Sequence, residues 1–437
     1  MTTCFDVIVV GAGPCALATL SALPANLSVA IITGSEPALP SPSDVHPKVR
    51  VVSLESGQHP GVADRIEPTE GKHRTLYATA ITGGLANYWG QQFVRYGRGD
   101  PYGADLFTNY QAYIDECSNM EALFCLTGGV PFPGPTHLPE GFILHEPRLL
   151  NGTADNAAAG LDAMQFAIDQ AMKNYTCVAC RATRLSRTET GEWSVHLSDG
   201  SRVTGRKIWL AAGVIGTAQL VLNSIDTLRG ASFRDHAPYM AYASGLRHLL
   251  RARPGRHFNA YTLERIESSH CDVFASIYDM GSAELNLVLG SAINLVSPFL
   301  RGVRSPSLAS MLQPVQIWTM RSFSLIVLDA TGSRYSSYLD DASTDDGLCQ
   351  TIAAVSSLGG KVWRHNRTPG GLGFHYHDLR MTLDDGRDIP VNTLLRRWSD
   401  GHVLCSDASI LPTIGLRPHT LTAMATARYL VKKQSEQ

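Results

Sequence analysis

The sequence Phe-Asp-Val-Ile-Val-Val-Gly-Ala-Gly-Pro-Cys-Ala at residues 5–16 joins an apolar run directly to a glycine-rich turn. The run at 5–10 is rich in β-branched residues and contains no breaker, which is typical of a strand buried on both faces. Residues 17–23 then have a helix-like pattern that stops at a proline, and residues 28–33 predict a second strand. A strand, a Gly-x-Gly-x-x-Ala turn, a helix and a strand in this order predict a dinucleotide-binding unit, and a purely structural glycine turn is the alternative.

The glycines of this turn suit a pyrophosphate for a physical reason. At Gly11 and Gly13 the backbone can turn tightly and approach the phosphates, whose charge then lies at the N-terminus of the following helix. An acidic residue about 20 positions further on is expected to hold the adenosine ribose. The second strand ends at Thr33, and Glu36 is the nearest acid at that spacing. Glu36 either reaches the ribose hydroxyls or is a solvated loop residue.

Composition narrows the class of protein. The chain has 437 residues, 37 basic against 39 acidic side chains, a formal net charge of −2, 44% hydrophobic residues and 17% charged residues. This apolar content is enough for a large core and excludes wholesale disorder. The near-neutral charge gives no reason to expect nucleic acid or an anionic membrane as a partner. The length predicts two or three structural units.

Neither a targeting segment nor a membrane span is recognisable in the sequence. The first strand begins within a few residues of Met1, with no basic region or cleavage site before it. The longest apolar stretch, 285–296, is interrupted by polar residues and is too short to cross a bilayer. Nine cysteines, an odd number in a long chain, do not indicate a disulfide framework. We therefore expect a cytoplasmic protein with no membrane span.

Several segments further along the chain carry readable patterns. Residues 82–90 (TGGLANYWG) place three glycines around small and aromatic residues, which indicates a loop whose backbone passes close to a flat group. Residues 157–173 have helical periodicity, and residues 178–203 predict short strands joined by tight turns. Residues 207–220 predict a strand, a glycine turn and a helix but lack a second full fingerprint, which argues against a separate NADPH site.

The pattern of apolar and polar residues in the sequence changes after residue 232. Residues 233–379 alternate apolar and polar side chains between proline, serine and glycine breaks, which predicts a β-rich second domain. Residues 234–236 (RDH) are expected to form a hinge at its start. Residues 401–425 predict a strand, a loop with an acidic residue, and a helix that begins near a proline. Such an element is suited to closing over a cofactor that the chain start already holds.

Together these segments resemble the glucose-methanol-choline (GMC) family of flavin-dependent oxidoreductases. The resemblance implies an α/β fold in which a Rossmann-like FAD-binding domain joins a β-rich α+β substrate domain. Each matching element alone is a weak signal, and the four in register carry the resemblance. They follow the family's order along the chain: Gly11-Ala12-Gly13-Pro14, Gly83-Gly84 through Trp89-Gly90, residues 211–217 (AAGVIGT), and Asp407-Ala408-Ser409 through Pro412 and Pro418 to Thr422.

The resemblance also implies how the domains divide the chain. The FAD-binding domain would be assembled from residues 1–110, 151–232 and 380–437. The substrate domain would be residues 233–379, with 111–150 as a connector at its edge. A length of 437 residues is short for this family, which implies a trimmed substrate domain.

The implied cofactor is FAD, bound non-covalently. Some family members attach FAD through a histidine in the Gly-Gly loop, whereas the nearby positions here are Tyr88 and Trp89. The first glycine turn would line the pyrophosphate, the Gly-Gly loop would pass along the isoalloxazine, and Val178 would touch the adenine. Asp407 would lie near the ribityl chain or pyrophosphate, and the helix that starts at 418–420 would stabilise negative charge on the reduced flavin. The implied cofactor-binding residues are Gly11, Gly13, Pro14, Ala16, Glu36, Gly83, Gly84, Asn87, Trp89, Val178, Ala212, Gly213, Asp407, Ala408, Pro418, His419 and Thr420.

Alcohol oxidation in this family uses a histidine base, a role that needs a side chain titrating near neutrality. The family histidine precedes an Arg-Met pair, here at 380–381, and its position falls on Phe374 without a gap or on His375 with a one-residue deletion. His375 and His377 would share a face of a strand, so either could be the base, or each could be a hydrogen-bonded structural histidine. With Asp378 they lack a third ligand at convincing spacing, so no metal site is predicted.

The second catalytic position of the family precedes a proline, and here it is Arg417, with His419 after the proline. An arginine cannot act as a base but can hold an anionic or enolate oxygen. One interpretation is a small acidic or carbonyl-bearing substrate clamped by Arg417, with oxygen or an unknown acceptor reoxidising the flavin. The other is that the scaffold catalyses an isomerisation, cyclisation or other tailoring step on a biosynthetic intermediate. The candidate catalytic residues are His375, His377, Arg417 and His419.

Overall fold

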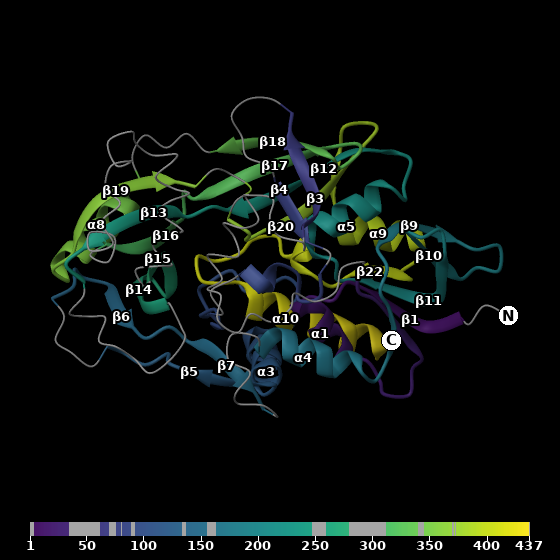
Figure 1. The fold of residues 1–437 in the computed structure, drawn as a ribbon, viewed down its shortest axis with the longest axis horizontal. Helices are drawn as coiled ribbons and strands as arrows, with labels where there is room; N and C mark the ends of the chain where they lie inside the picture. Colours follow the sequence, from purple (N-terminus) through teal and green to yellow (C-terminus); the bar gives the residue numbers. More distant parts are fainter. Residues whose placement is uncertain are drawn as a thin grey trace.

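The structure is a computed structural model, shown as a ribbon in Figure 1. Its described residues are 4–34, 62–69, 76–79, 81–88, 92–132, 137–154, 163–246, 259–278, 312–339, 345–368, 371 and 373–436. Two predicted cofactor-binding residues, Glu36 and Trp89, lie outside these ranges. The described strands form three large sheets and one two-stranded sheet.

The first sheet is built around β1 (Cys4–Val10), whose last four residues are buried. Its strand order is β8-β2-β1-β11-β10-β9, with β22 beside the end of β11. The pairs among β8, β2, β1, β11 and β22 are parallel, and β10 and β9 extend the sheet by antiparallel pairing. Three separated parts of the chain therefore meet at the carboxyl edge of one sheet, where open α/β folds bind ligands. The bounds are Val29–Ile32 for β2, Thr176–Val178 for β8, Ala182–Arg187 for β9, Trp193–Leu197 for β10, Arg202–Leu210 for β11 and Val403–Cys405 for β22.

The strand, turn and helix predicted at the chain start are confirmed, with one shift. α1 (Pro14–Leu20) begins at Pro14 rather than at Leu17, because proline is tolerated in the first helical turn, where its missing N–H has no partner to lose. α1 packs against α10 (Thr420–Ser435) and α4 (Ala163–Met172), and α10 packs against α3 (Tyr110–Glu121). In Figure 1 these four helices lie together on one side of the first sheet.

The second sheet has the order β21-β20-β12-β17-β18-β3-β4. Its strands β12 and β20 pair with each other, and the predicted domain boundaries at 232 and 379 both fall inside them. The stretch 234–236, expected to be a hinge, is instead the end of β12. The bounds are Val62–Pro68 for β3, Leu76–Thr79 for β4, Leu228–His236 for β12, Phe323–Asp329 for β17, Arg334–Leu339 for β18, His377–Leu383 for β20 and Asp388–Pro390 for β21.

The third sheet has the order β19-β13-β16-β15-β14-β6 and is covered by α8 (Asp346–Ser357), which packs against β15, β16 and β19. All of its strands except β6 come from the stretch 233–379, so the β-rich character predicted there is confirmed. The small fourth sheet pairs β5 with β7. The bounds are Phe124–Thr127 for β5, Phe142–His145 for β6, Leu149–Thr153 for β7, Tyr239–Ser244 for β13, Asn259–Glu267 for β14, His270–Tyr278 for β15, Leu312–Thr319 for β16 and Lys361–Arg367 for β19.

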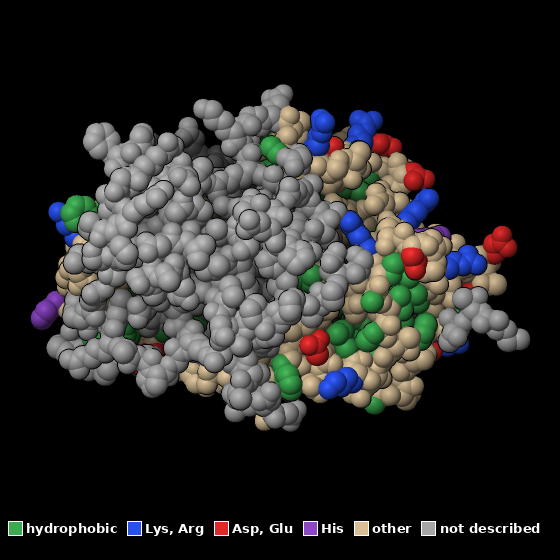
Figure 2. All heavy atoms as spheres, viewed as in Figure 1, with side chains coloured by type: hydrophobic (Ala, Val, Ile, Leu, Met, Phe, Trp, Pro, Cys, Tyr) green, Lys and Arg blue, Asp and Glu red, His purple; other side chains and the backbone are tan. Residues whose placement is uncertain are grey.

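Two further helices, α5 (Gly213–Leu222) and α9 (Val391–Ser399), complete the described elements that position the site. On the described part of the face in Figure 2, Lys and Arg side chains are intermingled with Asp and Glu, as the near-zero net charge leads one to expect. Within the described ranges, no helix is both long enough and apolar enough to cross a membrane.

Candidate active site

The glycine turn after β1 is shaped by a close approach of backbone. Gly11 has a φ of +120°, and a Cβ there would lie 2.2 Å from the carbonyl oxygen of Ala211. The Ala211 N–H donates to the carbonyl of Val10 at 2.8 Å, so the ends of β1 and β11 are joined at this point. Glycine alone tolerates both the φ and the contact. Gly13 differs, because the nearest atom to its Cβ would be the Gly83 carbonyl oxygen at 4.0 Å.

The Gly-Gly loop lies directly on this turn. The Gly83 N–H donates to the Ala12 carbonyl at 2.6 Å, and a Cβ on Gly84 would lie 4.0 Å from the Gly13 Cα. Gly83 and Gly84 have φ values of +91° and +57°. A short 3₁₀ helix, η1 (Gly84–Tyr88), follows and contains Asn87. Two glycine-rich segments far apart in the sequence thus form one surface lined by backbone.

The loops after β11 and β22 reach the same edge of the sheet. Gly213, with a φ of +72°, begins α5, and a Cβ there would meet no atom of the described residues within 4 Å. The buried Asp407 carboxylate accepts from the Thr217 hydroxyl of α5 at 2.7 Å and from the Ser409 N–H at 2.9 Å. Asp407 therefore joins the loop after β22 to α5, a role that the sequence did not predict.

The other described cofactor candidates occupy element ends nearby. Val178 ends β8, and its carbonyl accepts from the Thr33 N–H at 3.1 Å, so it lies at the carboxyl edge of the sheet. Cys15, in the first turn of α1, shares a small apolar cluster with Phe323 and with Ala423 of α10. The remaining predicted positions lie in the first turn of α1 (Pro14, Ala16), at the two loop ends (Ala212, Ala408) and at the start of α10 (Pro418, His419, Thr420).

Two of the predicted histidines are in ring contact. The His375 ring stacks on Trp318, with ring centroids 5.7 Å apart and an interplanar angle of 11°. The His419 ring meets His375 edge-on at a centroid distance of 5.1 Å. The structure therefore brings together one histidine from the loop before β20 and one from the N-terminus of α10.

Two more histidines complete the cluster around Phe323. His236 stacks on the Phe323 ring at 4.2 Å, its centroid is 6.1 Å from that of His375, and His377 meets Phe323 edge-on at 5.7 Å. His236 was expected only as part of a hinge. It joins the cluster through the pairing of β12 with β20, which aligns residue 234 with His377 and brings the two strand ends together, and no local sequence pattern signals this pairing.

The loop that carries His375 is wrapped around one buried carboxylate. Asp235 Oδ2 accepts from the N–H groups of Gly371 and Gly373 at 2.8 Å each, and Oδ1 accepts from the His375 N–H at 3.1 Å. Strand β20 begins only at His377. The expectation that His375 and His377 share a strand face is therefore wrong, because Asp235 holds His375 in a loop.

Three of the clustered histidines are uncharged at neutral pH. Burial lowers the pKa of His236 and His377 to about 3 and the pKa of His419 to about 4. His377 Nδ1 lies 3.1 Å from the carbonyl oxygen of His375, so this nitrogen carries the proton, and Nε2 has no hydrogen-bond partner among the described residues. The cluster therefore offers ring lone pairs rather than positive charges.

Replacing Asp235 by asparagine should loosen the histidine loop. An asparagine has one acceptor oxygen where the carboxylate uses two, and its NH₂ group would face an N–H donor. We expect D235N to lower the free energy of unfolding by about 2–3 kcal/mol. Because burial raises the pKa of Asp235 to about 6, urea denaturation should be followed at pH 8, where the group is ionised. The exposed control D385N should leave stability nearly unchanged, and equal losses in both variants would contradict this role for Asp235.

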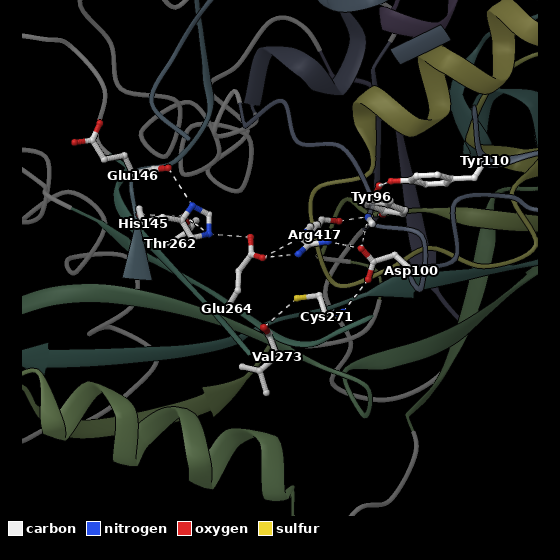
Figure 3. Close-up of polar contacts among 11 residues, drawn as sticks. Tyr96, Asp100, Tyr110, His145, Glu146, Thr262, Glu264, Cys271, Val273 and Arg417 are labelled. Carbon is white, nitrogen blue, oxygen red and sulfur yellow. Dashed lines mark hydrogen bonds and ion pairs between the residues drawn. The ribbon is translucent and has the colours of Figure 1, made fainter. Parts of the chain in front are cut away.

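A chain of ion pairs is centred on Arg417, which lies two residues before His419 in the sequence; Figure 3 shows Arg417 and its partners. Arg417 Nε and Nη2 donate to Glu264 Oε2 at 3.0 and 2.6 Å, and Nη1 donates to Asp100 Oδ2. Glu264 Oε1 lies 3.0 Å from His145 Nε2. Both carboxylates are buried, with side-chain exposures of 7% for Glu264 and 2% for Asp100, so the guanidinium charge is compensated inside the protein.

This pairing bears on the role expected for Arg417. A substrate clamp needs a cation whose charge and N–H donors are available to the substrate. Here three of the five guanidinium donors face Glu264 and Asp100. The structure argues against Arg417 as a substrate clamp and makes it an anchor of the turn that precedes α10.

The His145 end of this chain predicts a pH dependence of stability. Burial disfavours a charged imidazole, but the hydrogen bond and charge of Glu264 outweigh it and raise the pKa of His145 above 6.5. A raised folded-state pKa adds stability that is fully present below pH 6.5 and is lost as pH rises through the folded-state value. The free energy of unfolding of the wild type should therefore exceed that of H145Q most at pH 5.5–6. Denaturation from pH 5.5 to 8.5 checks this, and a pH-independent difference would contradict it.

Comparisons with known proteins give no sequence-level match but a full-length structural one. No protein-family model matches the chain, and no curated protein matches it. The pyridoxine 4-oxidase from Mesorbium loti matches with 16% identity and a TM-score of 0.56 over 100% of both chains. Two mutants of formate oxidase from Aspergillus oryzae RIB40, described for effects on FAD modification, match with 10% identity over 99% of both chains and TM-scores of 0.58 and 0.61.

These matches cover the first sheet and the β-rich region alike. They confirm the predicted fold class, in which a Rossmann-like domain joins a β-rich α+β domain as in the GMC flavoproteins. At identities of 10 to 16% the likeness shows the fold, and the chemistry has to be argued from the site.

Proposed function

We propose that the chain is an FAD-dependent oxidoreductase that oxidises a C–OH, or related C–H, group of a small organic molecule by hydride transfer. The observation that supports the proposal is the proximity of the first glycine turn to the histidine cluster. Cys15, beside the glycine turn, and Phe323, whose ring contacts His236 and His377, both pack against one apolar cluster that contains Ala423 of α10. The surface suited to a dinucleotide and the groups suited to proton transfer are therefore neighbours in the fold.

The described residues fit FAD. Gly13, Gly83 and Gly84 present a surface without side chains, which a pyrophosphate or a flat ring can approach closely. Among the described residues, no side chain caps the first N–H groups of α10, which can donate to a polar ring edge. When bound, FAD supplies the hydride acceptor. The Gly-Gly loop at 82–90 contains no histidine, which supports non-covalent binding.

We assign acceptance of the substrate hydroxyl proton to His375. Its loop is only partly buried, and its ring contacts both Trp318 and His419. His377 is fully buried, and its lowered pKa makes it a poor base at neutral pH. His419, edge-on to His375, would hold the same substrate oxygen.

The electrostatics favour an uncharged substrate over an acid. The Arg417 charge is balanced by Glu264 and Asp100, and three histidines of the cluster are neutral. An anion would gain little attraction here and would lose its hydration. Oxygen or another acceptor would complete the cycle by reoxidising the flavin.

The test of this function is spectroscopic. Purified protein should carry FAD, and a substrate alcohol added without oxygen should bleach its absorbance, which readmitted oxygen or an added acceptor restores. Turnover with no flavin reduction and no oxygen uptake would favour the alternative, a non-oxidative isomerisation or cyclisation on the same scaffold. A protein that cannot be reconstituted with FAD would contradict both.

A further inference from the structure

The turn that carries His419 is held by contacts that take no part in the proposed reaction. Arg417 lies two residues before His419, and its guanidinium is held between Glu264 of β14 and Asp100 (Figure 3). The backbone carbonyl of Arg417 accepts from the Tyr96 hydroxyl at 3.0 Å. Both the side chain and the backbone of Arg417 are therefore fixed.

The two carboxylates are fixed in turn. Asp100 Oδ1 accepts from the Cys271 N–H of β15 at 2.8 Å, and its Oδ2 accepts from the Gly97 N–H at 2.7 Å. Glu264 Oε1 faces His145 Nε2 of β6 at 3.0 Å. Because β6, β14 and β15 are adjacent strands, the third sheet determines the position of Arg417 through both carboxylates.

Apolar contacts connect the same turn to the histidine pair. Leu416, beside Arg417, is buried in a cluster with Phe274 and Trp318. Trp318 is the ring on which His375 stacks, and His375 contacts His419. The turn that carries Arg417 and the histidine pair therefore share the Trp318 ring as a contact.

We propose that Glu264 is a positioning residue, which acts through Arg417 to hold His419 against His375. The proposal rests on the proposed function, in which these two histidines form the reactive pair. Glu264 belongs to β14 of the third sheet and does not contact the reacting atoms, so in this role it affects the rate of flavin reduction only through the position of His419.

The structure offers a matched pair of variants. E264Q keeps the side-chain length and removes the charge that faces Arg417. D272N is the control, because Asp272 of β15 pairs with Arg265 of β14 (Nε–Oδ1 2.9 Å) and has a side-chain exposure of 8% against 7% for Glu264. Each variant removes one buried carboxylate from the same two strands, but only Glu264 contacts Arg417.

Two measurements distinguish a specific effect on the position of His419 from the general destabilisation that the loss of a buried carboxylate causes. In the apoprotein, the ¹H–¹⁵N ring resonances of His419, assigned with H419N, should shift in E264Q and stay in place in D272N. In the FAD-loaded protein, E264Q should slow anaerobic flavin reduction about tenfold or more while the substrate Kd changes less than about twofold, since misplaced groups act on the reacting geometry. An E264Q protein that matches D272N in both readouts would overturn the proposal.

The apoprotein readout is independent of the proposed function. A His419 shift confined to E264Q supports the positioning role even if no alcohol reduces the flavin of the wild type, a result that would count against the function alone. If E264Q does not fold, E264D replaces it, because it keeps the charge and shortens the reach. E264D should move the His419 resonances in the same sense, and unmoved resonances would overturn the proposal.

Discussion

H375N is expected to slow anaerobic reduction of the flavin by about 10²–10⁴-fold, the range that a positioned general base supplies. The reason is geometric, because His375 lies in a partly buried loop and contacts His419, whereas His236 and His377 are fully buried. Asparagine can still hydrogen-bond but cannot take the substrate proton. Stopped-flow absorbance at saturating substrate measures the rate, with FAD content as the check that the site is intact.

H377N is the matched comparison for this experiment. His377 lies two residues away in the same cluster, but it is fully buried and its Nδ1 is committed to the His375 carbonyl. We expect H377N to leave the reduction rate within about tenfold of the wild type, since a ring with so low a pKa is a poor base. Equal, small effects of H375N and H377N would refute the assignment of the base.

The sequence was most informative where function depends on local backbone geometry. The turn at Gly11 and Gly13 was predictable because the constraint, a strand followed by a tight turn and a helix, is written in consecutive residues. The carboxyl edge of the first sheet followed from the same reasoning, since parallel strands end on one side. The start of α10 was likewise signalled by Pro418, which lies two residues before the first residue of the helix.

The interactions that decide the role of Arg417 could not be predicted in this way. Its partners lie 153 and 317 positions away in the chain, at Glu264 and Asp100. A sequence pattern shows that a cationic side chain precedes a proline. It does not show whether carboxylates compensate the charge of that side chain in the folded protein. The same limit applies to His236, which joins the cluster through the pairing of β12 with β20.

Burial also bears on the roles expected for the candidate histidines. A histidine titrating near neutrality was expected at the site, yet burial lowers the pKa of His377 to about 3 and that of His419 to about 4. Desolvation depends on the whole surrounding fold and leaves no trace in local sequence. Proximity alone therefore does not choose the base, and the exposure of each ring has to be considered.

G11A and G13A are expected to separate what the two glycines of the turn do. At Gly11 an alanine meets the Ala211 carbonyl at 2.2 Å with a φ of +120°, so G11A should lower the free energy of unfolding of the apoprotein by about 3 kcal/mol or more. At Gly13 the φ of −98° is ordinary, and among the described residues the nearest atom to an added Cβ is the Gly83 carbonyl oxygen at 4.0 Å. G13A should therefore change the free energy of unfolding by less than about 1 kcal/mol. Urea denaturation of the apoproteins measures both.

G13A, which is expected to keep the stability of the wild type, should lose affinity for FAD. The Cβ introduced by G13A would stand on the surface shared with Gly83 and Gly84, where a pyrophosphate needs close contact with backbone, so binding should weaken at least about tenfold in a protein that folds normally. Titration of the apoprotein with FAD, followed by quenching of flavin fluorescence, measures this. A G13A protein that binds FAD as the wild type does would remove the glycine turn from the proposed cofactor site and leave it a purely structural turn. A stable G11A protein would contradict the close approach of β1 and β11, on which the position of that site depends.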